Sequence, residues 1–157
     1  MDDTSAYDAD LPPRLPLDEW PPLRTQAELH HHWRGLMGPL GFTFRRLWLL
    51  FLDPDDRVVP HVTEIDDIPE EPRTEEVDAL MAMCAHVQQA DRIARVAILL
   101  SRPGRGALCA SDRRWGRALD GSARRAGVRL APLHLANDEV LVPLTGDDLL
   151  ESRAGAR

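Results

Sequence analysis

RVAILLSRPGRGALCASDRRW, residues Arg95 to Trp115, decides the fold of this chain. Its apolar run Val96–Leu100 is too short for a globular helix and is bounded by Ser101 and Pro103, so we predict a strand buried on both faces. A loop with two glycines follows, and an amphipathic helix is predicted to begin at Ser111. Ligands often bind where a central strand of an α/β sheet ends and a helix begins. The stretch therefore locates a candidate site.

The rest of the chain alternates between helical and strand patterns. The predicted elements are, in order, a helix after the capping box Thr25–Glu28, a hairpin of strands Phe44–Leu52 and Arg57–Ile65, a helix capped by Thr74, the central strand, the helix from Ser111, strands Val128–Ala136 and Glu139–Leu144, and a short acidic helix or frayed tail from Gly146. This order predicts an α/β fold, a mixed sheet with helices on both faces. Because the two long helices act as crossovers, part of the sheet should be parallel.

Composition favours one domain with a real core, since the chain has 157 residues of which 43% are apolar. We expect an extended or disordered arm over residues 1–24, a single domain over 25–150 and a flexible tail over 151–157. The net charge of -7 argues against general attraction to nucleic acid or to anionic lipid. The charge is uneven, however, because residues 92–129 contain ten arginines and two acids.

The cysteines and the N-terminus set expectations for the cellular setting. Cys84 and Cys109 form no CxxC pair, so no disulfide scaffold or zinc ribbon is predicted and a reduced, cytoplasmic setting fits best. The start of the chain is acidic and lacks an apolar core, and no apolar run is long enough to cross a bilayer. We therefore expect neither export nor membrane insertion.

The run His30–His32 does not suggest a metal site, because adjacent helical residues point about 100° apart.

Two tetrapeptides around the central loop carry a resemblance to a known family. Leu100-Ser101-Arg102-Pro103 at the strand end and Cys109-Ala110-Ser111-Asp112 at the helix start are similar to the His-x-His-Pro and Ser-x-x-Asp patterns of the JAB/MPN superfamily, especially its RadC-like bacterial branch. The segment from Gly127 to His134 also resembles the family's glycine, strand and His-bearing segment. The resemblance covers roughly Arg45 to Leu144 and implies a three-layer, cytidine-deaminase-like architecture.

Departures from the family pattern decide the chemistry that we expect. In active members the two histidines and the aspartate bind zinc, and an upstream glutamate acts on the zinc-bound water. Here both histidines are missing, and Asp112 and Cys109 supply at most two ligands. The fixed positive charge of Arg102 beside them repels a cation. We therefore predict no metal, no other cofactor and no zinc metalloprotease activity. Glu64 is the nearest candidate for the upstream glutamate, so any remaining catalysis would involve Cys109, Asp112 and Glu64.

The same loop also suits other chemistries. Its guanidinium groups and flexible backbone N–H groups at a helix start could hold a carboxylate or phosphate, and the candidate binding residues are Ser101, Arg102, Gly104, Arg105, Arg113 and Arg114. The loop matches no nucleotide-binding motif. A structural interpretation stays open, in which the glycines and the proline shape a turn, Ser111 caps the helix, and the arginines are solvated or pair with Asp112. A Cys109 thiolate with His134 as base is a further alternative.

Two hypotheses of different class follow. The first is a non-catalytic JAB/MPN-like domain, a pseudoenzyme that binds a protein partner or its own copy through the arginine-rich loop face or an aromatic surface around Trp20, Trp33 and Trp48. The second is an enzyme or a binder of a small molecule or anion that uses the 101–114 loop. It predicts a concave pocket lined by Ser101, Arg102, Arg105, Cys109 and Asp112. Nucleic-acid binding ranks behind both, because the basic stretch is not interleaved with exposed aromatic residues.

Overall fold

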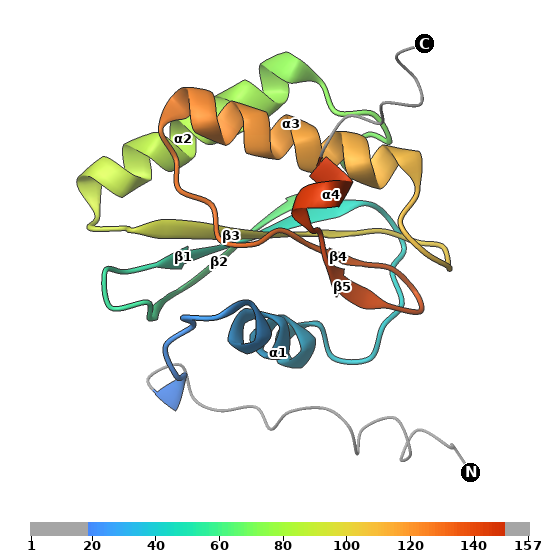
Figure 1. Cartoon of the computed structure of the whole chain (residues 1–157), viewed down its shortest axis with the longest axis horizontal. Coiled ribbons are helices and arrows are strands. Elements are labelled where there is room, and N and C mark those ends of the chain that lie inside the picture. The colour runs from blue at the N-terminus through green and yellow to red at the C-terminus, as the bar shows by residue number, and fades with distance from the viewer. Residues whose placement is uncertain (1–18, 150–157) are drawn as a thin grey trace.

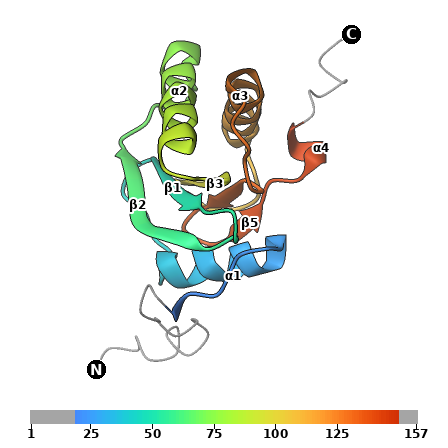
Figure 2. The ribbon, with the colours of Figure 1, turned by 90° about the vertical axis from the view of Figure 1, so that its left-hand side faces the viewer.

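A five-stranded mixed sheet lies between one helix on one face and two on the other in the computed structural model, which describes residues 19–149 (Figure 1). The elements are α1 (Gln26–Met37), β1 (Arg46–Leu52), β2 (Val58–Asp66), α2 (Thr74–Ala90), β3 (Arg95–Ser101), α3 (Ala110–Ala126), β4 (His134–Ala136), β5 (Leu141–Pro143) and α4 (Gly146–Leu149). The view along the sheet in Figure 2 shows α2 and α3 above it and α1 below it. The predicted α/β class, with helices on both faces of the sheet, is confirmed.

The strands lie in the order β2-β1-β3-β4-β5. β1 pairs antiparallel with both β2 and β3, and β5 pairs antiparallel with β4. β3 and β4 run parallel because α3 crosses over between them. The sheet is therefore mixed, and its parallel part follows a helical crossover as predicted.

β3 is buried on both faces, as its apolar sequence predicts. Ile98 and Leu100 belong to the core shared with α2 and α3, whereas Ala97 and Leu99 belong to the core under α1. On the α1 side, Trp33 and Leu29 fill the space against the sheet. The two cores sandwich the sheet, which fixes the direction of each side chain along β3.

The helix starts differ in part from those predicted. The capping box of Thr25 and Glu28 is present at the start of α1. Thr74, however, is the first residue of α2 after the N-cap Arg73, and it makes no capping hydrogen bond. Ser111 lies inside α3, and its hydroxyl donates to the Glu70 carbonyl. The predicted caps at Thr74 and Ser111 are therefore wrong.

The strand predicted over Val128–Ala136 is shorter in the structure. Only residues 134–136 form β4, and an isolated bridge joins Leu130 to Val96. Pro132 lies between these two pairings, and proline has no N–H to give to a ladder. β5 is likewise limited to three residues. The short acidic helix predicted from Gly146 is present as α4.

The segment before α1 is packed on the hairpin. Leu23 is 2% exposed, and its N–H donates to the Asp56 carbonyl. Trp20 packs edge-on against His32, with ring centroids 4.4 Å apart. Residues 19–24, the end of the arm predicted over 1–24, thus lie against the body of the protein, while 1–18 and the predicted tail at 151–157 lie outside the described residues. No helix within residues 19–149 is long and apolar enough to span a bilayer.

Candidate functional site

A buried ion pair joins the end of β3 to the start of α3. Arg102 Nε donates to Asp112 Oδ1, and Arg102 Nη2 donates to Asp112 Oδ2, each over 2.7 Å. The Arg102 side chain is 7% exposed and that of Asp112 is 0% exposed. A planar guanidinium bound to a carboxylate at two points has one preferred geometry. The pair is therefore a fixed internal contact.

Asp112 is held in its charged form. Burial alone would raise the pKa of Asp112, but the hydrogen bonds from Arg102 and from the Cys109 N–H, which lies 2.9 Å from Oδ2, together lower it. The same contact with Asp112 raises the pKa of Arg102. Both oxygens of Asp112 thus accept hydrogen bonds from the protein, beside a guanidinium whose charge repels a metal ion.

The alternation of β3 explains how these residues meet. Leu100 points toward α2 and α3, so Ser101 points toward α1 and Arg102 points again toward α3. Leu100 and Arg102 are the positions that the sequence analysis compared with the two histidines of His-x-His-Pro. They lie on the same face of the sheet as Asp112.

The glycine loop after Arg102 is bound by the protein's own acids. The Gly104 N–H donates to Asp138 Oδ2 over 2.8 Å, and the Gly106 N–H donates to Glu139 Oε2 over 3.0 Å. Gly104 has φ 106°, a conformation that favours glycine. In the sequence analysis, these N–H groups were considered as possible donors to an external carboxylate or phosphate. They are instead occupied by two side chains of the β4–β5 turn.

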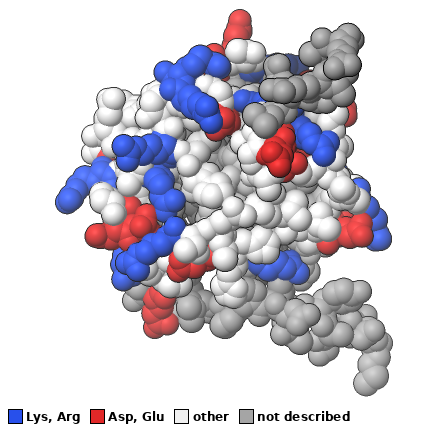
Figure 3. Space-filling model, in the orientation of Figure 1, with Lys and Arg blue, Asp and Glu red and all other residues white. Residues whose placement is uncertain are grey.

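The other arginines of the predicted anion site point to separate partners. Arg114 forms a two-point ion pair with Glu71, and Arg113 Nε lies 4.0 Å from Asp148 Oδ1. Arg105 is exposed and has no ion pair within residues 19–149. On the face shown in Figure 3, arginines and acids are interspersed. The arginine-rich half of the sequence does not form one continuous basic surface on that face.

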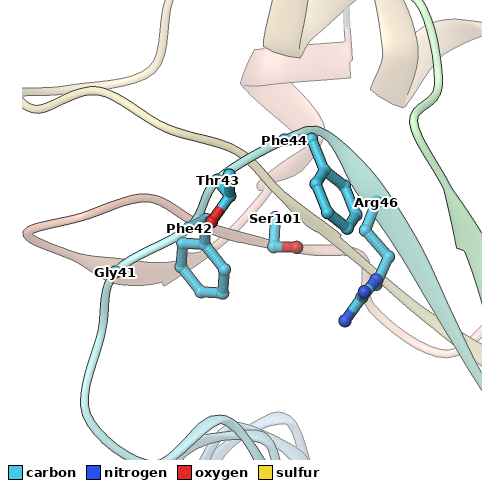
Figure 4. Close-up of a pocket in the computed structure, with 6 residues that line it drawn as sticks. All are labelled: Gly41, Phe42, Thr43, Phe44, Arg46 and Ser101. Atoms are coloured by element: carbon cyan, nitrogen blue, oxygen red, sulfur yellow. The ribbon is translucent and has the colours of Figure 1, made fainter.

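Ser101 lines a cleft on the α1 face. Its side chain is buried, and its Oγ accepts a hydrogen bond from Trp48 Nε1 over 2.9 Å. The cleft has an empty volume of about 400 Å³ including space open to solvent, and it is lined by Gly41, Phe42, Thr43, Phe44, Arg46 and Ser101 (Figure 4). The pocket predicted over the loop was to contain Arg102 and Asp112 as well. Those two residues do not line this cleft.

The remaining catalytic candidates lie apart from Asp112. Glu64 on β2 is opposite Trp48, which packs against the α1 core. The ring of His134 lies 5.8 Å from that of His30 on α1, so it also faces the α1 side. Asp112 lies on the other face of the sheet. The structure therefore does not bring Glu64 to Asp112 or His134 to Cys109.

Cys109 is the N-cap of α3. It is exposed, and its sulfur accepts a hydrogen bond from the Asp112 N–H while Asp112 accepts one from the Cys109 N–H. This reciprocal arrangement is a capping box. Cys109 thus has a structural role that the sequence analysis assigned to Ser111.

Asp138 is the site residue that the sequence analysis missed. It lies in the turn between β4 and β5, and it accepts hydrogen bonds from the Gly104 N–H and, over 2.8 Å, from the Phe42 N–H. The signal was available, since Asp138 follows a strand parallel to β3, and the carboxyl ends of parallel strands meet at one edge of a sheet.

The predicted aromatic surface is smaller than expected. Trp33 is 0% exposed and belongs to the α1 core. Trp48 is half-buried beside Phe44, which is 38% exposed. The exposed aromatic area is therefore centred on Phe44 and Trp48.

Across the part of the chain that the structure describes, no three or more His, Cys, Asp or Glu side chains are grouped so that they could hold a metal ion. No family model and no curated protein matches the chain. The interpretation of the site therefore depends on its own geometry.

Proposed function

We propose that this chain is a JAB/MPN-like domain of the RadC-like branch that lost its zinc ligands and acts without catalysis as a protein-interaction module in a reduced cytoplasmic setting. The buried Arg102–Asp112 ion pair is the observation that carries the proposal. The family pattern has two histidines and an aspartate as ligands at these positions. Here the guanidinium of Arg102 satisfies the aspartate that a zinc ion would need.

The arrangement around the pair supports the proposed relationship. Leu100, Arg102 and Asp112 share one face at the β3–α3 junction, as three ligands of one ion must. The element order of helix, hairpin, helix, strand, helix and two strands is the order on which the resemblance is based. Loss of a metal site would leave this arrangement, in which the three positions still converge but only Asp112 keeps a metal-binding side chain.

The alternative of an anion-binding loop has less support. The N–H groups of Gly104 and Gly106 and the guanidinium of Arg102 are the natural donors for an anion, and each already contacts a carboxylate of the chain. An external anion would have to displace those contacts. An interaction role requires no such rearrangement, since the area around Phe44 and Trp48 is already accessible.

Metal content tests the proposal. Protein expressed in zinc-supplemented medium and purified without chelator should contain far less than one zinc per chain by elemental mass spectrometry. Added zinc should also leave its melting temperature unchanged, because a ligand that binds the native state raises it. One zinc per chain, with histidine coordination seen by X-ray absorption, would overturn the proposal.

A further inference from the structure

Among residues 19–149, β2 is an edge strand that pairs on one side only. It is nine residues long, ends the strand order and pairs with β1. Alternate N–H and C=O groups of an antiparallel edge strand point away from its neighbour and can pair with another chain. A register shift interrupts the half of β2 that contains Pro60, whereas Val62–Asp66 pairs regularly with β1. The stretch Val62–Asp66 is therefore the part of the edge that can accept a further strand.

On the α1 face this edge is acidic. Glu64 and Asp66 are side by side at alternate positions, with side chains 43% and 54% exposed. Both contact Arg46, whose guanidinium carbon lies 4.9 Å from the ring centroids of Phe44 and Trp48. Two carboxylates around one guanidinium leave an excess negative charge. A strand beside β2 would therefore favour basic side chains on this face.

On the opposite face the edge is bordered by a side of α2 that carries Leu80, Met83 and Val87, with the Arg73–Glu76 ion pair at its first turn. Asp78 faces α3, where it accepts hydrogen bonds from Ser122 and Arg125. At about 100° per residue, Leu80 and Val87 lie nearly opposite Asp78 on the helix and therefore away from α3. Figure 2 shows α2 above the β1–β2 side of the sheet, with α3 farther from β2. Met83 lies on the same side of α2 and is 41% exposed. A strand beside β2 would therefore favour apolar side chains toward α2.

We propose that Val62–Asp66 binds an extended segment of a partner protein as a sixth strand, with basic and apolar residues alternating along that segment. The basic residues lie beside Glu64 and Asp66, and the apolar ones lie beneath Leu80 and Met83. This inference rests on the proposed function and names the partner's chemistry. A second copy of β2 suits the edge less well, because pairing two copies brings their acidic faces together.

Binding of an alternating probe peptide tests the inference. The probe is a fluorescent, end-capped octapeptide of four Lys-Val repeats, titrated with the full chain and followed by anisotropy. It should bind about tenfold more tightly than a Glu-Val octapeptide. It should also bind more tightly than a block peptide of the same composition, in which all the lysines precede all the valines. Equal affinity for the three peptides would overturn the inference.

Variants locate the binding edge. Asp66→Lys and Met83→Asp should each weaken Lys-Val binding severalfold without a large change in melting temperature, since both side chains are substantially exposed. Asp147→Lys, a change of an exposed acid on α4, is the matched control and should leave binding unchanged. Binding that survives both edge variants would contradict the assigned position.

Backbone methylation distinguishes strand pairing from mere charge attraction. A strand at a sheet edge uses the N–H groups of alternate residues, so N-methylation of one alternate set should abolish binding and methylation of the other set should not. Equal effects of the two sets would overturn strand addition. A dimer in light scattering that Asp66→Lys disrupts would assign the edge to a second copy instead. If the peptide tests fail, this inference is overturned but the metal-content test of the proposed function is unaffected. If the protein binds zinc, the proposed function is overturned but the peptide-binding result is unaffected.

Discussion

Arg102 and Asp112 lie ten positions apart in the chain, and their side chains meet in two parallel hydrogen bonds away from solvent. Breaking one partner of a buried ion pair is costly because the other charge remains without compensation. Replacing both partners by apolar residues is often neutral. Each of the two buried charges is therefore tolerated in the folded protein only while the other is present.

Substitution of Arg102 alone should destabilise the protein strongly. Arg102→Met leaves the carboxylate of Asp112 buried without its main donor, so the free energy of unfolding should fall by about 3–5 kcal/mol. The double variant Arg102→Met/Asp112→Leu should recover most of that loss. Urea denaturation of the wild type, both single variants and the double variant measures the coupling. Additive effects of the two substitutions would show that the pair is not coupled.

Stability should fall between about pH 6.5 and 4 because of a buried histidine. Burial lowers the pKa of His134 to about 4, with a smaller effect from His30, against an ordinary value of 6.5. Its Nδ1 lies 3.0 Å from the Pro132 carbonyl, and its Nε2 has no partner among the described residues. The unfolded chain therefore takes up a proton first as the pH falls, which costs the folded state up to about 3 kcal/mol at pH 4.

Two histidine variants separate this effect from general acid sensitivity. His134→Gln removes the titrating group, so the slope of unfolding free energy against pH should become shallower in that window. His32 will still contribute, since burial lowers its pKa to about 4 as well. His86→Gln replaces an exposed histidine of α2 and is the matched control for the substitution itself. An unchanged slope in His134→Gln would contradict the assignment.

Loss of Asp138 should release the loop after β3. Asp138→Ala removes the acceptor for the N–H groups of Gly104 and Phe42, so hydrogen exchange of these two amides should become faster by NMR. Amides in the centre of β3, such as that of Ile98, should keep their protection. Asp147→Ala on α4 is the control and should change neither set. Unchanged exchange at Gly104 would show that the carboxylate does not hold the loop.

Local sequence patterns predicted the elements whose causes are local. The apolar run Val96–Leu100 indicated a strand buried on both faces, and it packs against both helical layers. The capping box of Thr25 and Glu28 contains both of its partners within one helical turn. Such patterns can be recognised in the sequence because the residues that cause the burial or the cap are adjacent or one helical turn apart.

Contacts between distant segments were harder to predict. The hydrogen bonds of Gly104 with Asp138 depend on the parallel pairing of β3 and β4, which no single segment specifies. Ser111 has the side chain of a good cap, but it lies inside α3 and binds the carbonyl of Glu70, a residue 41 positions away. Arg102 was considered as an anion ligand and as a partner of Asp112, and the buried geometry favours the second. Tertiary packing determines each of these three contacts.

Two histidines at the end of β3 would restore the ligand pattern from which this chain is proposed to have diverged. Leu100→His together with Arg102→His recreates His-x-His-Pro on the face that carries Asp112. We expect this variant to bind one zinc per chain by elemental mass spectrometry, to gain melting temperature on addition of zinc, and to lose both properties when Asp112→Asn is added. A variant that binds no more zinc than the wild type would contradict the claim that Arg102 replaces a metal ligand.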